Sequence, residues 1–222
     1  MNYYTFAFFN LPLFLFALLA IRLMVQQADL KWVLLIGLLA SFSYGNGLLV
    51  WVIGILVSLI QANYKRLFLY FGVLATLLLF YFFQETPADS SHGIDAKFLV
   101  DIVLYFIQIH AYFINWPGYA LPWAPLVIGA GIIALFGYVL IKSKLLDPKS
   151  EKSYLLFYLL FLSLSMALIS LARASVDGLT ANVVDHYKIY SCLFLGCLVY
   201  YTTEQLKLST RWSYSFWLLV YS

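Results

Sequence analysis

The sequence predicts an all-α fold, a polytopic bundle of transmembrane helices with about seven or eight membrane segments. Of its 222 residues, 64% are hydrophobic and only 10% are charged, whereas a soluble domain carries roughly 25% charged residues. The mean hydropathy is +0.90, and the apolar residues gather in blocks that approach the roughly 20 residues a membrane-crossing helix needs. We therefore expect a single transmembrane domain over residues 1–222, a multi-pass location in the cell inner (plasma) membrane, and the lipid bilayer as partner.

The apolar blocks follow one another with short polar segments between them. They cover residues 5–21, 32–43, 48–60, 67–83, 98–114, 123–141, 154–172 and 189–203, and a last run covers 212–221. The last run has only about half the length of a span, and half a span would leave backbone groups unpaired in lipid. We therefore expect a fragment that is truncated at its C-terminus, and we leave truncation at the N-terminus open.

Residues 32–60 carry no charge and predict a pair of short helices. At a rise of about 1.5 Å per residue, this stretch is too long for one upright helix and too short for two complete spans. Gly45, Asn46 and Gly47 interrupt it, and all three residues favour a turn with positive φ. The two helices should meet at this turn, which would return the chain to the side from which it came.

Residues 98–114 predict an amphipathic or re-entrant helix. Asp101, Tyr105, Gln108 and Tyr112 recur at the spacing of one helix face. An Asp that faces lipid is costly, so this helix should lie at the membrane interface or line a wet cavity. A full crossing stays open, because helix bundles tolerate polar residues that face inward.

The basic residues favour the first of these two arrangements. If 98–114 does not cross, ten of the 13 Lys and Arg residues share one side, and only Lys97, Arg173 and Lys188 lie on the other. If 98–114 crosses, the two sides become almost equal in basic charge. Because Lys and Arg concentrate in cytoplasmic loops, we place the ten in the cytoplasm and expect the functional loops on the extracytoplasmic side.

Several kinds of function and site find no support in the sequence. Basic clusters with interleaved aromatic residues are missing, which argues against a nucleic-acid partner. The GxSxG, HExxH, P-loop and GxGxxG motifs are missing as well. Cys192 and Cys197 lie five residues apart in an apolar block, so we expect buried thiols and no disulfide between them. Any cofactor remains unknown.

The expected outside loops carry two groups of ionisable residues. Glu85, Asp89, His92 and Asp95 lie close together, and His92 and Asp95 could offer ligands to a cation. Their spacing matches no known metal signature, so we expect a solvated loop and no metal site. Small residues elsewhere predict close helix contacts. These are Ala130, Ala134 and Gly137 in one block and Ser163, Ser165 and Ser170 in the next.

The second ionisable group lies in the loop 173–188. Arg173 ends an apolar block, and a guanidinium at such a position can hold a phosphate through two parallel N–H donors. Asp185 and His186 could serve as base, acid or ligand. In the alternative interpretation Arg173 is an interfacial anchor whose side chain snorkels to the surface, and Asp185 pairs with Lys188 or Arg173.

Two stretches carry a resemblance to a known family. The first runs from Ser41 to Trp51 with the letters SFSYGNGLLVW, and a basic turn and a block ending in Tyr81-Phe-Phe follow it. The second runs from Ala172-Arg173 to Asp185-His186-Tyr187. Together they resemble bacterial polytopic membrane proteins with a GT-C-like glycosyltransferase architecture. In those proteins a small-residue turn precedes GLLxW, and an Arg and a Gly-containing loop precede Ser-Arg-Tyr.

The resemblance implies a function and a set of site residues. Arg173, Gly178 and Tyr187 match the family's second pattern, whereas Asp185-His186 stands where the family has Ser-Arg. GT-C-like enzymes use a polyprenyl-phosphate sugar donor, and their catalytic Asp or Glu lies in a first large outside loop that would precede this chain. The resemblance thus implies the later membrane half of such a protein, inactive alone, with unknown catalytic residues. Arg173, Tyr187, Asp185 and His186 would bind the polyprenyl-phosphate-linked sugar.

Two other functions stay open at this point. A transporter or lipid flippase would need polar groups near mid-membrane, for which Asp101 and Gln108 are the candidates, and often an internal repeat, which the sequence does not display. A noncatalytic membrane scaffold is also compatible with the composition.

Overall fold

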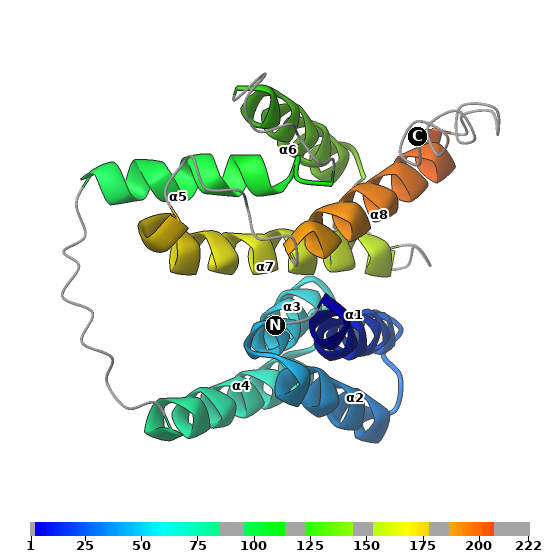
Figure 1. The fold of residues 1–222 in the computed structure, drawn as a ribbon. Coiled ribbons are helices and arrows are strands. Elements are labelled where there is room, and N and C mark those ends of the chain that lie inside the picture. The colour runs from blue at the N-terminus through cyan, green and yellow to red at the C-terminus, as the bar shows by residue number, and fades with distance from the viewer. Residues whose placement is uncertain (1–2, 85–95, 114–122, 144–152, 178–186, 207–222) are drawn as a thin grey trace. The chain divides into compact units, whose positions relative to one another are not determined.

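The computed structural model describes residues 3–84, 96–113, 123–143, 153–177 and 187–206 (Figure 1). Every regular element in this part of the chain is helical, which confirms the all-α prediction. The elements are α1 (Tyr3–Val25), α2 (Leu30–Ser43), the 3₁₀ helix η1 (Gly45–Leu48), α3 (Leu49–Ile60), α4 (Tyr64–Gln84), α5 (Ala96–Ile109), α6 (Ala124–Lys142), α7 (Ser153–Asp177) and α8 (Lys188–Leu206).

Three of the described helices are long and apolar enough to cross a membrane. The candidate spans are Tyr64–Tyr81, Ala124–Lys142 and Ser153–Arg173. Three more apolar helices are shorter and cover Asn10–Val25, Leu30–Ser43 and Gly45–Ile60. A membrane protein is therefore supported, with fewer full-length candidate spans than the expected seven or eight segments.

The chain divides into two compact units, which we describe separately. The first comprises Met1–Asp95 and Leu146–Ser165, and the second comprises Ala96–Leu145 and Met166–Ser222. Helix α7 contributes its first half to one unit and its second half to the other. The single domain expected over 1–222 stays a prediction.

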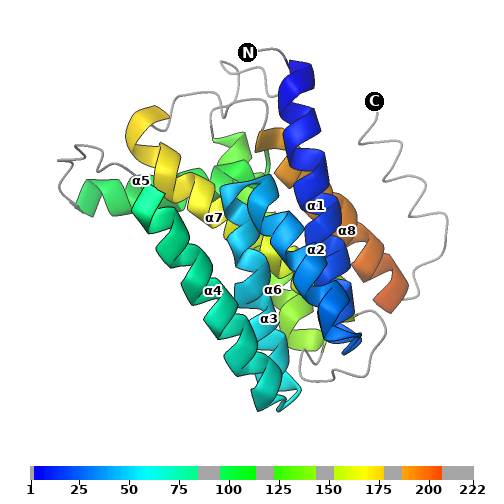
Figure 2. The same cartoon turned by 90° about the horizontal axis from the view of Figure 1, so that it is seen from below.

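The first unit contains two helical hairpins, α1–α2 and α3–α4, and α1 also packs against α3 (Figure 2). Both hairpins turn in the same way. Gln27 and Ala62 adopt left-handed backbone conformations with φ of 52° and 53°. In each turn the next amide donates to a carbonyl five residues back, from Ala28 to Leu23 and from Asn63 to Ser58. These are the hydrogen bonds of a Schellman helix end, so one turn design occurs twice.

Hydrogen bonds join the two turns to each other. The Arg66 guanidinium donates through Nη2 to the carbonyl oxygens of Gln27 at 3.0 Å and Ala28 at 2.8 Å. Gln61 Nε2 donates to the Val25 carbonyl at 2.8 Å. Side chains of the second turn therefore satisfy carbonyls that the end of α1 leaves without helical partners.

The predicted junction of two short helices is confirmed at Gly45–Leu48, but the expected backbone conformation is wrong. The turn is a 3₁₀ helix, and neither glycine in it nor Asn46 has a positive φ. Glycine is needed at position 47 for space, because a Cβ there would overlap the Ala40 carbonyl. Beside the turn, Trp51 Nε1 donates to Ser41 Oγ at 2.8 Å, and the Tyr81 hydroxyl donates to the Ser41 carbonyl at 3.0 Å.

In the second unit α5 packs against α6 at a glycine. A Cβ at Gly129 would overlap the Ile107 carbonyl, so this position allows the two backbones to approach. The close contact predicted at Ala130, Ala134 and Gly137 is wrong. Both alanines are exposed, and a Cβ at Gly137 would meet nothing within 4 Å. Composition pointed to the right block but to the wrong face of its helix.

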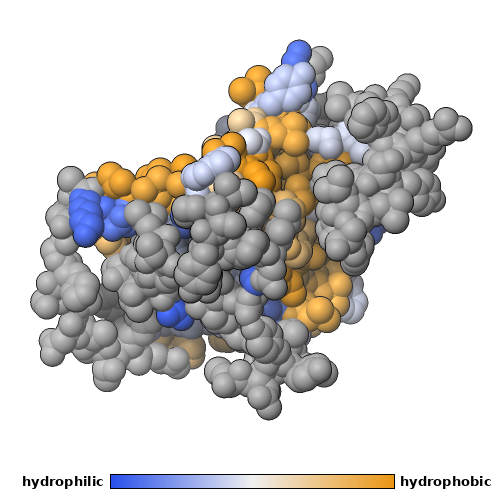
Figure 3. Space-filling view, turned by 45° about the horizontal axis from the view of Figure 1, so that its top comes forward, coloured by the Kyte–Doolittle hydropathy of each residue, from blue (hydrophilic) through white to orange (hydrophobic). Residues whose placement is uncertain are grey.

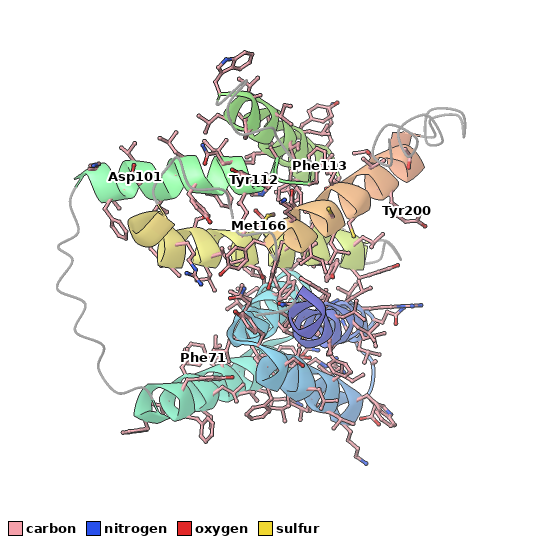
Figure 4. The ribbon with its side chains drawn as sticks, viewed as in Figure 1. Phe71, Asp101, Tyr112, Phe113, Met166 and Tyr200 are labelled. Atoms are coloured by element: carbon pink, nitrogen blue, oxygen red, sulfur yellow. The ribbon has the colours of Figure 1, made fainter. Side chains whose placement is uncertain are left out.

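The polar stripe of α5 faces the interior, as an amphipathic helix requires. Tyr105 and Gln108 are 1% and 6% exposed, whereas Val103 on the other face is 55% exposed. Asp101 and Tyr112, half-buried, lie near the start of α5 and just beyond its end (Figure 4). The stripe thus meets protein, while α5 is not among the candidate spans of the described chain.

Hydrophobic side chains cover much of the described surface on the face drawn in Figure 3. By their exposed fractions, Phe68 and Phe71 on α4 and Ile141 on α6 are exposed hydrophobic residues of two candidate spans. A surface of this kind is stable when it contacts lipid rather than water. Cys192 is exposed and Cys197 is only partly buried, so the expectation of two buried thiols is wrong.

Candidate functional site

Two of the four predicted site residues come together in the second unit. Arg173 ends the candidate span Ser153–Arg173, and Tyr187 directly precedes α8. The Arg173 Nε–H donates to the Tyr187 hydroxyl oxygen at 3.2 Å, and the guanidinium carbon lies 5.9 Å from the centroid of the Tyr187 ring. Fourteen residues separate the pair in sequence. Helix α7 continues to Asp177, so the first residues of the loop expected at 173–188 are helical, and the contact joins the last turns of α7 to the residue before α8.

The environment of this pair suits an oriented cation. Tyr187 is only 6% exposed, so its ring is a fixed support, while Arg173 is half-buried. The hydrogen bond and the ring together restrain the plane of the guanidinium. A restrained guanidinium that ends a span can offer its fork of N–H donors to an anion at the membrane interface.

The other predicted site residues lie outside the described part of the chain. This is the case for Asp185 and His186 in the loop 173–188. Glu85, Asp89, His92 and Asp95, which we expect to form a solvated loop, also lie outside the described residues. Within the described residues, no group of three His, Cys, Asp or Glu side chains could hold a metal ion.

A buried histidine that the sequence analysis did not single out lies beyond the end of α5. His110 is 0% exposed, and its Nδ1–H donates to the Phe106 carbonyl at 2.8 Å. Its ring meets Phe106 and Phe194 edge to face at centroid distances of 4.6 and 5.0 Å. The Ser191 hydroxyl donates to the His110 carbonyl at 3.0 Å.

Burial lowers the pKa of His110 to about 4, although the hydrogen bond to the Phe106 carbonyl opposes this shift. The imidazole is therefore neutral near pH 7. His110 connects the end of α5 to α8 through its ring contact with Phe194 and through the hydrogen bond from the Ser191 hydroxyl. This is a structural role. An isolated His in an otherwise apolar block was the only sequence signal that could have drawn attention to it.

Comparisons with known proteins find no relative of this chain. No protein-family model matches the chain, and neither a curated protein nor a solved structure is significantly similar to it. The candidate site therefore stands on the geometry of Arg173 and Tyr187 alone.

Proposed function

We propose that this protein is the membrane part of a GT-C-like glycosyltransferase and binds a polyprenyl-phosphate-linked sugar at the extracytoplasmic face of a bacterial inner membrane. The observation that carries the proposal is the Arg173–Tyr187 pair, in which a hydrogen bond of 3.2 Å orients a guanidinium at the end of a candidate span. The proposed topology has seven or eight membrane segments, with α5 as the segment that does not fully cross.

The physical argument starts from the depth of the site. A lipid-linked phosphate lies at the membrane interface, where the end of a span also lies. Arg offers two parallel donors to a phosphate, whereas Lys offers a compact point charge. Contact with Tyr187 restricts the rotation of the guanidinium before the ligand arrives, which lowers the entropy lost on binding. In this proposal Arg173 and Tyr187 position the donor phosphate, and we assign no catalytic residue.

The proposal is tested by binding of a polyprenyl phosphate to the full chain in lipid nanodiscs. We expect Arg173→Ala and Arg173→Lys to weaken binding by about tenfold or more, because neither variant restores the bidentate contact. Tyr187→Phe should weaken binding by about fivefold, because the guanidinium loses one orienting hydrogen bond. Lys97→Ala is the matched control, since Lys97 is an exposed cation expected on the same side of the membrane.

The anchoring alternative predicts a different pattern. A lysine at position 173 would snorkel as well as arginine does, so the Arg173→Lys variant would bind the ligand like the unmodified protein. That result, with normal folding and insertion, would remove the proposed phosphate contact.

A further inference from the structure

Helices α6 and α8 enclose a hollow of about 190 Å³ in the second unit. We call it the α6–α8 hollow. Its apolar wall comes from α6 and includes Leu135 and Val139, and its polar side includes Lys142, Ser143 and Thr202. The combination of an apolar wall and a polar rim is typical of a site for an amphiphile.

The rim carries a cation. Lys142 is the exposed last residue of α6, and its Nζ lies 6.0 Å from the centroid of the Tyr138 ring. This cation–π contact holds the ammonium beside the hollow. Next to it, the Ser143 hydroxyl donates to the Leu140 carbonyl at 3.2 Å, and Tyr201, which is only 5% exposed, also lines the hollow. The rim thus offers one positive charge, while the Ser143 and Thr202 hydroxyls donate to backbone carbonyls of their own helices.

The position of the rim matches a membrane surface. Lys142 ends the candidate span Ala124–Lys142. The stretch of α8 from Lys188 to Thr202 is roughly 21 Å long at 1.5 Å per residue, so the hollow and the Arg173–Tyr187 pair lie near opposite ends of α8. On the expected topology the hollow belongs to the cytoplasmic surface.

We propose that the α6–α8 hollow binds the phosphate headgroup of an anionic phospholipid of the cytoplasmic leaflet. Lys142 attracts the phosphate, and Leu135 and Val139 contact the glycerol and the first methylenes. The cytoplasmic leaflet is rich in anionic lipid, and basic residues near its surface favour binding of that lipid.

The size and the lining favour a lipid headgroup over other phosphates. At about 190 Å³ the hollow is smaller than the roughly 300 Å³ of the smallest drug-sized sites, so it accommodates only part of a ligand. A lipid leaves its acyl chains in the bilayer and needs no more space than this. A free phosphate has the same charge chemistry but gains nothing from the apolar wall.

The test uses the full chain, purified in detergent, stripped of lipid and titrated with phosphatidylglycerol or phosphatidylcholine. Native mass spectrometry counts the bound lipid. We expect one phosphatidylglycerol to bind more tightly than phosphatidylcholine, and Lys142→Ala to weaken its binding about fivefold. Lys65→Ala is the charge control, because Lys65 is an exposed lysine in the first unit, on the same expected side of the membrane.

A second pair of variants tests the hollow itself without changing any charge. Thr202→Phe should fill the space and weaken phosphatidylglycerol binding by a similar factor. Leu135→Trp fills the same hollow from its exposed wall, and it replaces Thr202→Phe if that variant loses helicity or becomes polydisperse. Excess inorganic phosphate should leave the bound lipid in place.

Three results would overturn the proposal. Equal losses in the Lys142 and Lys65 variants would show unspecific attraction of anionic lipid. Full binding after the hollow is filled would show that the space plays no part. Displacement of the lipid by inorganic phosphate would show a simple anion site without a role for the lipid.

Discussion

The glycines of this chain matter more for the space that they leave to a neighbouring backbone than for their ability to adopt a positive φ. The two left-handed turn positions hold Gln27 and Ala62 rather than glycine, which costs about 1–2 kcal/mol at each position. Gly47 and Gly129, in contrast, lie where a Cβ would overlap a backbone carbonyl of a neighbouring helix. In a membrane bundle, small residues allow this kind of close backbone approach.

The η1 turn offers a matched test of this interpretation. Gly47→Ala should destabilise the protein by about 1–3 kcal/mol, because the new methyl group forces the turn away from α2. Gly45→Ala should have little effect, since a Cβ at Gly45 meets nothing within 4 Å. Thermal unfolding in detergent would measure both variants. Equal stabilities would show that the spacing between η1 and the Ala40 carbonyl does not constrain position 47.

At the scale of elements, α5 combines a buried polar stripe with an exposed apolar face. Gln108 and Tyr105 are buried in the second unit, and Val103 is exposed on its surface. The apolar face suits contact with lipid at the membrane interface, and the stripe avoids the large cost of a polar group in hydrocarbon. The helical spacing of the polar residues therefore predicted both that this segment is a helix and which of its faces is buried.

Two substitutions on opposite faces of α5 test its placement. Asp101→Leu should leave membrane insertion unchanged, because position 101 lies on the stripe that meets protein. Val103→Asp should reduce insertion, with a penalty on the order of 2–3 kcal/mol if that face meets the bilayer core. A glycosylation-based insertion assay measures both. Similar insertion of the two variants would contradict the assignment of the two faces.

At the scale of the whole molecule, charge distribution predicts the topology. The ten-to-three division of basic residues places the sequence around Lys149 in the cytoplasm and that around Asp89 outside. Both positions lie outside the described part of the chain, so this stays a prediction from sequence. It also determines on which side the Arg173–Tyr187 pair and the α6–α8 hollow would meet their ligands.

Single cysteines give a direct measurement of this topology. The native Cys192 and Cys197 would first be replaced by Ala. Asp89→Cys should then react with a membrane-impermeant thiol reagent added to intact cells, while Lys149→Cys should react only after the membrane is opened. Equal labelling of both from outside would contradict the predicted orientation.

The sequence by itself determined the class of this protein. Apolar blocks and scarce charge predicted a helical membrane protein, which the described helices and their three candidate spans support. The uncharged stretch with Gly45 and Gly47 located the junction of two short helices. The end of an apolar block at Arg173 also matched the end of a candidate span. These features are local, because helix formation and bilayer crossing depend on the residues of one continuous segment.

Only the tertiary structure decided which residues meet across the chain. The Arg66 contacts between two turns, the burial of His110 and the pairing of Arg173 with Tyr187 join residues that lie far apart in sequence. The sequence also did not predict that the two hairpins turn in the same way, because the hydrogen bonds of these turns run between backbone groups. Composition indicates which helices can approach closely, but the face that does so depends on the shape of the neighbour.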